Sequence, residues 1–283
     1  MRVLNVDGRA VLETAAGRAD VATASSGRFG PDPQSLFTEW DAFGAWAATV
    51  RPGPGGPEGP LRSPVPRPPQ VFAVGLNYVR HAEETGLAAA TARPLTFTKF
   101  PSSIAGPDGD LVLSGDQVDW EVELVAVIGR PAHRVAPEKA WDHVAGLTAG
   151  QDFSDRAVQM AGSPPQFSLG KSFPGYGPLG PALVTPDEFD DRDDLLLSCR
   201  VNGETVQEGR SSLMIHPVAR LVSALSWICP LGHGDVIFTG TPDGVGMGRK
   251  PARYLTSGDV VVTTVEGIGT MTHRCVAGTE VPA

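Results

Sequence analysis

The segment 120–129 carries two acidic side chains in an otherwise apolar run, which makes it the first candidate for chemistry in the chain. Its β-branched and apolar residues predict a strand. Because strand side chains alternate between faces, Glu121 and Glu123 share one face, about 7 Å apart, and Val125 and Val127 continue it. Two carboxylates in a buried strand need compensating charge, which a hard divalent cation supplies. A solvated strand end with Arg or Lys partners is the alternative.

A second candidate lies in the segment 77–84, directly after a predicted strand that ends at Gly75. His81 and Glu84 are three residues apart, so they share one face of a helical turn. A carboxylate beside an imidazole fixes its tautomer and raises its basicity, which suits a general base. A solvated helical turn with an incidental histidine is the alternative, although loops at strand ends often carry catalytic residues.

A third carboxylate follows a weakly apolar predicted strand, Val144–Ala149. Asp152 is a possible further cation ligand. Arg156 and Gln159 are again three residues apart and could hold a substrate carboxylate through ionic and amide contacts. An Asp that caps a helix, followed by surface residues, is the simpler interpretation of this segment taken alone.

Two more polar residues lie in loops rich in glycine and proline. Lys171 precedes the segment 175–181, which is predicted to be a fixed loop, and is either a buried cation near the acids or an ordinary surface lysine. Thr241 follows the predicted strand Val236–Thr239 in a turn whose free amides and hydroxyl could bind a carboxylate. A plain turn between two strands is the alternative, and the turn lacks the Gly-Lys-Ser/Thr ending of a phosphate-binding loop.

Composition narrows the class of protein. The 283 residues carry a net charge of −9 with a pI near 5.1, which argues against a nucleic-acid partner or an anionic membrane surface. No apolar run approaches the roughly 20 residues that span a bilayer, and the N-terminus lacks the plan of a signal peptide. The three cysteines are far apart and form no Cys-x-x-Cys pair, so we expect buried thiols in a reducing cytoplasm.

The elements that must position these residues indicate a β-rich α+β fold. Residues 1–70 are expected to be a small N-terminal domain, with a hairpin around Asp7-Gly8, a helical segment Pro33–Val50 and a Pro/Gly-rich linker over 51–70. Residues 71–283 are expected to be the catalytic domain. Its clearest helix is predicted between Ser211 and Trp227, with Leu213 on the apolar stripe and Pro217 in the first turns. Further strands are predicted at Val71–Gly75, Leu111–Leu113, Leu195–Val201 and Val260–Val265.

The order of these motifs resembles the fumarylacetoacetate hydrolase family, and in particular its acylpyruvate hydrolases and 2-hydroxyhepta-2,4-diene-1,7-dioate isomerases. The resemblance runs from about residue 71 to the C-terminus. It rests on Asn77-Tyr-x-x-His81-x-x-Glu84, Glu121-x-Glu123, Asp152-x-Ser-x-Arg156-x-x-Gln159, Gly170-Lys171-Ser172, Gly177-Pro-x-Gly-Pro181, Val201-Asn-Gly-Glu204 and Gly240-Thr241-Pro-x-Gly-Val-Gly246.

The resemblance implies a mixed β-roll or β-sandwich fold with a small N-terminal domain, in a cytoplasmic homodimer. It implies a Mg²⁺ or Mn²⁺ site, which Ca²⁺ could occupy in a crystal, built by Glu121, Glu123 and Asp152. His81 and Glu84 would lie on a lid over residues 79–93 and act in catalysis with Lys171. The positions that contact substrate or support the site would be Tyr78, Arg156, Gln159 and Thr241.

One departure from the family pattern concerns the arginine. The family commonly reads Asp-x-Ser-Ala-Arg-Asp, whereas this chain has Asp155 before Arg156 and Ala157 after it. Metal binding by Asp152 is unaffected by this difference. The orientation of Arg156, and with it the substrate preference, is the property that the departure puts in question.

The leading hypothesis for the activity is metal-dependent hydrolysis of a 2,4-dioxo acid of the acylpyruvate type. Glu84 orients His81, His81 activates a water that attacks the C4 carbonyl, and the C3–C4 bond breaks to give a metal-stabilised enolate. The same residues would support decarboxylation of a β-keto acid such as oxaloacetate, or isomerisation of a 2-oxo diacid. A non-catalytic scaffold is the alternative of a different class, but a scaffold has no need of so many acids in a strand.

Overall fold

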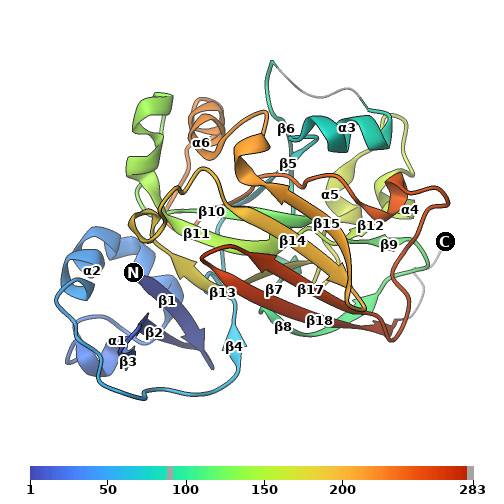
Figure 1. Ribbon diagram of the computed structural model, residues 1–283. Coiled ribbons are helices and arrows are strands. Elements are labelled where there is room, and N and C mark those ends of the chain that lie inside the picture. Colours follow the sequence, from blue (N-terminus) through green and yellow to red (C-terminus); the bar gives the residue numbers. More distant parts are fainter. Residues whose placement is uncertain (88–91, 279–283) are drawn as a thin grey trace.

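Two β-sheets organise the chain in the computed structural model, which describes residues 1–87 and 92–278 (Figure 1). The strands of the larger sheet are, in chain order, β1 Arg2–Val6, β2 Arg9–Thr14, β3 Gly17–Asp20, β4 Leu61–Arg62, β5 Val71–Gly75, β6 Leu95–Thr98, β7 Ile104–Ala105, β10 Val122–Ile128, β11 Val144–Gln151, β13 Gly177–Val184 and β16 Val236–Phe238. The smaller sheet contains β8 Asp108–Leu113, β14 Leu196–Val201, β15 Glu204–Arg210, β17 Val260–Val265 and β18 Gly269–Ala277, while β9 Val118–Asp119 pairs with β12 Ser154–Asp155. The predicted β-rich α+β fold is confirmed.

The larger sheet has the order β3-β2-β1-β13-β11-β10-β16-β5-β6, and the smaller has β15-β14-β17-β18-β8. The core between them contains alternate residues of β10, namely Val122, Leu124, Ala126 and Ile128, together with residues of β14, β17 and β18. Val125 and Val127 point to the opposite face of β10 and pack in a second core. Because this strand is buried on both faces, any charge on it must find its partner inside the protein.

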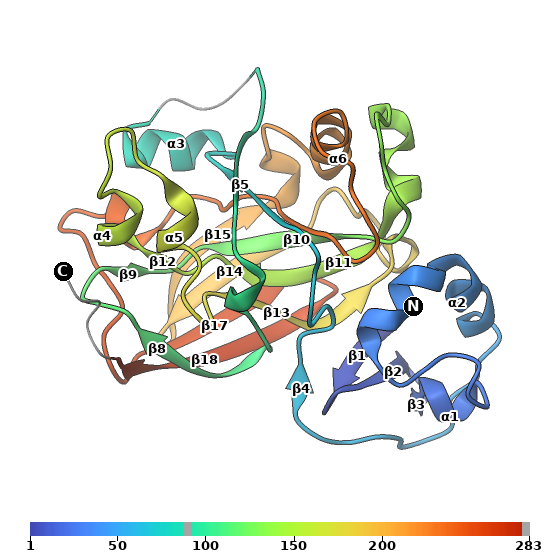
Figure 2. The same cartoon turned by 180° about the vertical axis from the view of Figure 1, so that it is seen from behind.

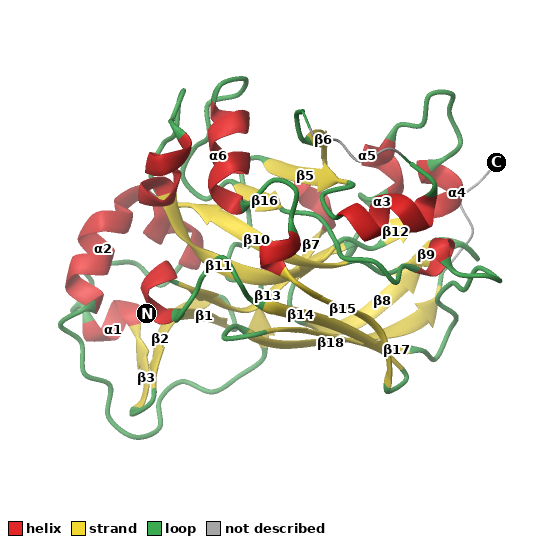
Figure 3. Ribbon diagram, turned by 45° about the horizontal axis from the view of Figure 1, so that its top comes forward, coloured by secondary structure: helices red, strands yellow, loops and turns green. Residues whose placement is uncertain are grey.

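Helices lie around the two sheets (Figure 3). They are α1 Val21–Ala24, α2 Trp40–Ala47, α3 Val79–Thr85, α4 Arg156–Gln159, α5 Phe167–Gly170 and α6 Val218–Ser226, with short 3₁₀ turns η1 Pro33–Glu39, η2 Pro101–Ser103, η3 Pro137–His143, η4 Pro186–Glu188, η5 Ser211–Leu213 and η6 Gly246–Gly248. The helix predicted within 211–227 begins only at Val218, after Pro217 as its N-cap, and Leu213 lies outside it, 62% exposed. None of the described helices is both long enough and apolar enough to cross a membrane.

The N-terminal elements lie at one side of the molecule and α3, α4 and α5 at the other (Figure 2). The predicted hairpin is confirmed: Val6 pairs with Arg9, and Asp7 and Gly8 both have positive φ, as a type I′ turn requires. Strand β1 also pairs with β13, so the N-terminal strands extend the larger sheet. The division into two domains at residue 70 stays a prediction.

Two segments that composition marked as irregular form strands. Leu61 and Arg62 pair with β1 because they occupy a short gap between the prolines of the expected linker. The segment 177–184, predicted as a fixed loop in its first part, is β13 and lies between β1 and β11. Its prolines are accommodated beside an irregularity in the β11–β13 pairing, which is where a sheet tolerates proline.

Candidate active site

The pairing of four strands brings the candidate residues to one end of the larger sheet. Strand β10 runs antiparallel to both β11 and β16, so its beginning meets their ends. Strand β5 runs parallel to β16, so β5 ends at the same place. The segments that follow β5, β11 and β16 therefore converge on Glu121 and Glu123, although they are far apart in the sequence.

The three carboxylates predicted to bind metal lie together. Each of Glu121, Glu123 and Asp152 offers an oxygen within 4.8 Å of the others, and all three are buried. Burial raises the pKa of Glu123 well above its ordinary value, and the charges of Asp152 and Glu121 raise it further. Burial also acts to raise the pKa of Glu121, but Lys171, Arg156 and His81 together lower it to about 2.

Two buried lysines balance part of this charge. Lys171 Nζ donates hydrogen bonds to Glu121 Oε2 at 2.7 Å and to Asp152 Oδ2 at 2.6 Å, so it is no surface lysine. Lys99 Nζ donates to Asp152 Oδ1 at 2.6 Å and also to the backbone carbonyl of Lys171. The pKa of Lys171 is raised because Asp152 and Glu121 outweigh its burial, whereas burial lowers the pKa of Lys99 despite Asp152.

Sequence reasoning missed Lys99. Its side chain is fully buried, yet it lies among edge-strand residues that are mostly exposed and carries no recognisable motif. A signal was present in the composition: the chain has only four lysines, and two of them are buried at this site. Fully buried lysine is rare without a partner, so each lysine of such a chain is a candidate for a paired buried charge.

The donor set fits a divalent cation. Glu123 accepts a hydrogen bond from the Gly240 amide at 2.7 Å, but among the described residues no ion pair is formed by this carboxylate. A buried carboxylate crowded by two others and without a cation of its own calls for positive charge at that position. Oxygen ligands of this kind are preferred by Mg²⁺ and by similar hard cations.

His81 and Glu84 form the predicted pair on α3. His81 Nδ1 lies 2.9 Å from Glu84 Oε1, and the imidazole is only 6% exposed, so this is no solvated first turn. Glu84 Oε2 accepts a hydrogen bond from the Gly244 amide at 2.9 Å. The carboxylate is therefore fixed from two sides and holds the imidazole, which leaves Nε2 as the nitrogen available to a substrate or water. Residues 88–91 of the expected lid lie outside the described residues.

Arg156 is oriented by an acid that sequence reasoning did not single out. Its Nε donates to Asp119 Oδ2 at 2.9 Å, its Nη1 donates to Gln159 Oε1 at 2.8 Å, and its Nη2 lies 2.7 Å from Glu121 Oε1 in an ion pair. Asp155, the acid that precedes Arg156, instead caps α4 by accepting from Val158 N at 3.0 Å. The question that Ala157 raised about the orientation of Arg156 is thus answered by Asp119.

The turn after β16 binds carboxylates of the protein itself. Gly240 N donates to Glu123, Gly244 N donates to Glu84, and Gly246 N and Met247 N donate to the two oxygens of Asp119 at 2.7 and 3.0 Å. These four amides, in the turn expected to bind a substrate carboxylate, already have carboxylate acceptors within the chain.

Thr241 and Tyr78 differ in their relation to the site. Thr241 lines the cavity, but its hydroxyl donates to Val122 O at 2.9 Å and accepts from Gln207, so its proton is already used. Tyr78 is buried with a hydroxyl that lacks a hydrogen-bond partner within the described residues, and it is not among the residues that line the cavity. Burial and the charge of Glu123 raise the pKa of Tyr78. The substrate contacts assigned to these two residues stay predictions.

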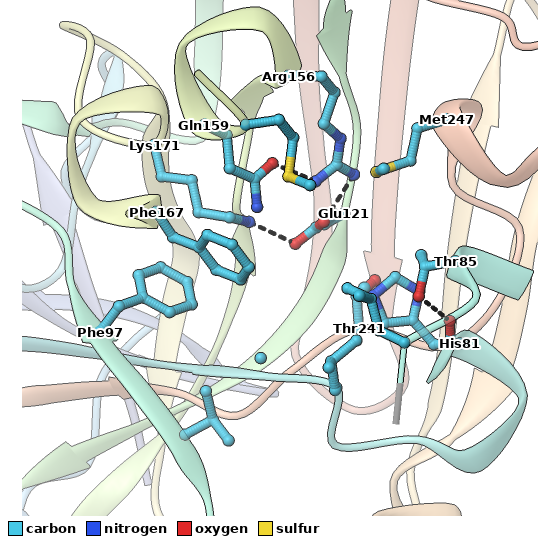
Figure 4. A pocket seen from close by; sticks show the side chains of 15 residues that line it. His81, Thr85, Phe97, Glu121, Arg156, Gln159, Phe167, Lys171, Thr241 and Met247 are labelled. Carbon is cyan, nitrogen blue, oxygen red and sulfur yellow. Dashed lines mark hydrogen bonds and ion pairs between the residues drawn. The ribbon is translucent and has the colours of Figure 1, made fainter. Parts of the chain in front are cut away.

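A small cavity that is partly open to solvent lies between the acid–base pair and the carboxylate cluster (Figure 4). Its polar lining includes His81, Glu121, Arg156, Gln159 and Lys171, which the sequence had singled out. Figure 4 shows Arg156, Gln159 and Lys171 gathered around Glu121. The arrangement combines an acid–base pair, a carboxylate cluster suited to a cation and two protonated side chains, which is a set suited to carbanion or enolate chemistry.

Comparisons with known proteins show the family to which the chain is similar. The model of the fumarylacetoacetate hydrolase C-terminal domain matches residues 70–276. The human mitochondrial protein named oxaloacetate tautomerase FAHD2A is 43% identical over 216 residues, which are 76% of this chain and 68% of that protein.

Two solved structures resemble the whole chain. A crystal structure from Mycobacterium smegmatis, described as a candidate HpcE protein, is 52% identical with a TM-score of 0.95 and covers 99% of this chain and 100% of its own. A maleylpyruvate hydrolase from Sphingobium, solved with manganese(II) and pyruvate, is 25% identical with a TM-score of 0.77 and covers 99% of this chain and 100% of its own.

Proposed function

We propose, from the premise that this chain belongs to the fumarylacetoacetate hydrolase family, that it acts on a small 2-oxo acid through an enolate. Family membership rests on the match over residues 70–276 and on a relative that is 43% identical over more than two thirds of both chains. The observation that carries the proposal is the cavity lined by both His81 and Glu121. Glu84 holds His81 from behind, and Glu123 and Asp152 lie beside Glu121.

We assign the cation ligands to Glu121, Glu123 and Asp152, and Mg²⁺ or Mn²⁺ as the cation. When bound, a divalent cation would chelate the carboxylate and keto oxygens of a 2-oxo acid and stabilise negative charge on the keto oxygen. Manganese in the solved maleylpyruvate hydrolase supports a metal in this family, and the crowded Glu123 supports one here.

Hydrolysis of an acylpyruvate-type 2,4-dioxo acid is the first reaction that we propose for this site. His81 takes a proton from water through Nε2 while Glu84 holds Nδ1, and the resulting hydroxide adds to the C4 carbonyl. The C3–C4 bond then breaks, its electron pair passes to the enolate of pyruvate, and a carboxylic acid leaves. Protonation of the enolate at C3 then gives pyruvate, so that one water is consumed for each C3–C4 bond cleaved.

Lys171 supports this reaction as a fixed positive charge. Because its neighbours raise its pKa, it stays protonated at neutral pH and favours the enolate electrostatically. Arg156 and Gln159 line the same wall and are assigned to the substrate carboxylate. The hydrogen bond between them fixes the orientation of the guanidinium relative to the amide.

Keto–enol isomerisation of an oxaloacetate-type substrate is the second candidate, and the name of the 43% identical relative favours it. This reaction uses the same enolate and the same base but consumes no water: His81 would move a proton between C3 and the keto oxygen. Decarboxylation of the same substrate would share the enolate as well, but it would release CO₂.

Product analysis separates the reactions. Purified protein with Mg²⁺ or Mn²⁺ is given an acylpyruvate or oxaloacetate, and pyruvate, CO₂ and enol absorbance are followed. Pyruvate from the acylpyruvate supports hydrolysis, whereas a changed keto–enol rate without pyruvate supports isomerisation. His81→Asn should abolish both reactions. Full activity with excess chelator would contradict the proposal as a whole.

We also assign the chain to the cytoplasm as a homodimer, as the family resemblance and the reduced cysteines suggest. All three cysteines are free thiols. Light scattering of the purified protein reports the mass in solution, and a monomeric mass would refute the homodimer.

A further inference from the structure

We infer that the substrate carries an apolar group beyond its 2-oxo acid part, and that Leu76 helps to select it. The inference rests on the proposed function, because it takes the 2-oxo acid group to lie at the carboxylate cluster. It applies to hydrolysis of an acylpyruvate, whose acyl group is the apolar part, and it counts against oxaloacetate, whose second carboxylate would face the apolar wall.

Most of the cavity wall that is not part of the polar cluster is apolar. It is formed by side chains of β6 and α5, of the residues just after β5, α3 and α4, and of the segment after β16, namely Leu76, Leu87, Phe97, Met160, Phe167 and Met247. The rings of Phe97 and Phe167 pack edge to face with centroids 5.6 Å apart and lie next to each other in Figure 4. A substrate held at the acids thus meets apolar surface with its remaining atoms, and such surface rewards an alkyl or aryl group.

A second substrate carboxylate has no free cation to meet. Within residues 1–87 and 92–278, the Lys and Arg side chains lining the cavity are Lys171 and Arg156. Lys171 is bound to Glu121 and Asp152. Arg156 is paired with Asp119 and Glu121, and we have assigned it to the carboxylate of the 2-oxo acid group itself. A carboxylate placed against the apolar wall would lose its hydration without gaining a partner, which is unfavourable.

Leu76 has an unusual backbone conformation, which indicates that its side chain has a role in the cavity wall. Leu76 has φ of +55°, a left-handed conformation that leucine rarely adopts, and it is 8% exposed in the cavity wall. The next residue fixes this conformation: Asn77 Nδ2 donates to Thr239 O at 2.7 Å and to His216 O at 3.0 Å, while its Oδ1 accepts from His216 N. A leucine kept at a strained position that borders a cavity indicates that its side chain is used there.

The test is a matched pair of ligands that differ at one end. We would measure binding of 2-oxohexanoate and 2-oxoadipate to the full chain with Mg²⁺ or Mn²⁺ by titration calorimetry, with pyruvate as reference. The two acids share a 2-oxo acid group and differ in a terminal methyl against a terminal carboxylate. We expect 2-oxohexanoate to bind about tenfold more tightly or better, because only the carboxylate has to be desolvated without a partner.

Leu76→Arg should narrow or reverse this preference, and Leu76→Met should keep it. Both variants retain a side chain at the same left-handed position, so they differ in charge and not in the kind of backbone strain. Leu87→Arg is a second test of the wall at a position that is 41% exposed and therefore tolerant of change. Thermal melting identifies any variant that fails to fold, and the other arginine variant then decides.

If the unmodified chain bound 2-oxoadipate as tightly as 2-oxohexanoate or more tightly, this inference would be overturned. The proposed function would still stand in that case, provided that pyruvate bound. An unchanged ligand preference in a folded Leu76→Arg or Leu87→Arg variant would overturn it as well. Absence of pyruvate binding with either metal would instead count against the proposed function itself.

Discussion

Asp119→Asn should damage both the stability of the chain and its handling of substrate. Asp119 is fully buried and accepts four hydrogen bonds. Its Oδ1 accepts from the amides of Trp120 and Gly246, and its Oδ2 accepts from the amide of Met247 and from Arg156 Nε, all between 2.7 and 3.0 Å. Asparagine has a single acceptor oxygen, so its amide group would face two buried donors whichever way it turned.

The size of the effect follows from these contacts. Two buried donors left without an acceptor cost about 1–3 kcal/mol each, and loss of the charge opposite Arg156 adds to this. Because Glu121 remains as a partner of Arg156, we place the total near 3 kcal/mol. For a chain of this size that corresponds to a fall in melting temperature of about 6–10 °C.

The assay combines thermal melting with steady-state kinetics. We expect Asp119→Asn to raise KM for a 2-oxo acid substrate about tenfold, because the guanidinium loses the contact that aims it at the cavity. Asp116→Asn is the matched control, an exposed acid three residues away. If Asp119→Asn melted within about 1 °C of the control and kept its KM, the idea that Asp119 positions Arg156 would be refuted.

Three further results are expected. Binding of Mg²⁺ or Mn²⁺ should stabilise the unmodified chain by about 2.7 kcal/mol at a hundredfold excess over Kd, which is measured as a rise in melting temperature. Glu123→Ala should abolish this rise, whereas the exposed control Glu138→Ala should keep it. Glu84→Gln should lower turnover about a hundredfold with little change in pyruvate affinity, since the imidazole loses its orienting carboxylate; unchanged turnover would contradict its role. A hydrogen bond from Arg9 lowers the pKa of Asp20 from 3.8 to about 2, so its stabilisation is present above pH 4 and lost as pH falls toward 2. Asp20→Asn, which keeps the helix cap, should remove that acid dependence of the unfolding free energy, at most about 1 kcal/mol, as measured by urea titration at several pH values.

The strand that carries the site could be predicted from the sequence more directly than the long-range pairing that brings the other site residues to it. Strand β10 could be read from its apolar run, and the two glutamates on one of its faces followed from the period of a strand. The approach of Asp152 depends on Val122 pairing with Gln151, a register that no local pattern specifies. The order of the motifs indicated the family, and the family resemblance in turn implied that Asp152 lies near the two glutamates.

Lys99, Asp119 and β13 show where local reasoning stops. Lys99 and Asp119 lie in short segments whose neighbours say nothing about burial, and only the tertiary fold brings each to its opposite charge. β13 has the glycine and proline content of a loop, but it pairs with β1 and β11, each of which would otherwise have an unpaired edge at that place in the sheet. In these cases long-range pairing outweighs local propensity.

The turn after β16 explains how so many acids are held without a matching number of cations. Gly240 and Gly244 have positive φ, and their amides point at Glu123 and Glu84, one acid from the metal cluster and one from the acid–base pair. A side chain at Gly240 would approach Asn77 Cβ to 2.7 Å, so the turn needs glycine to come this close. Backbone amides stabilise a carboxylate without adding a full positive charge, so Glu123 keeps its demand for a cation. The same turn ties α3 to β10, which means that any movement of the helix carrying Glu84 must break a hydrogen bond to the element that also positions Glu123.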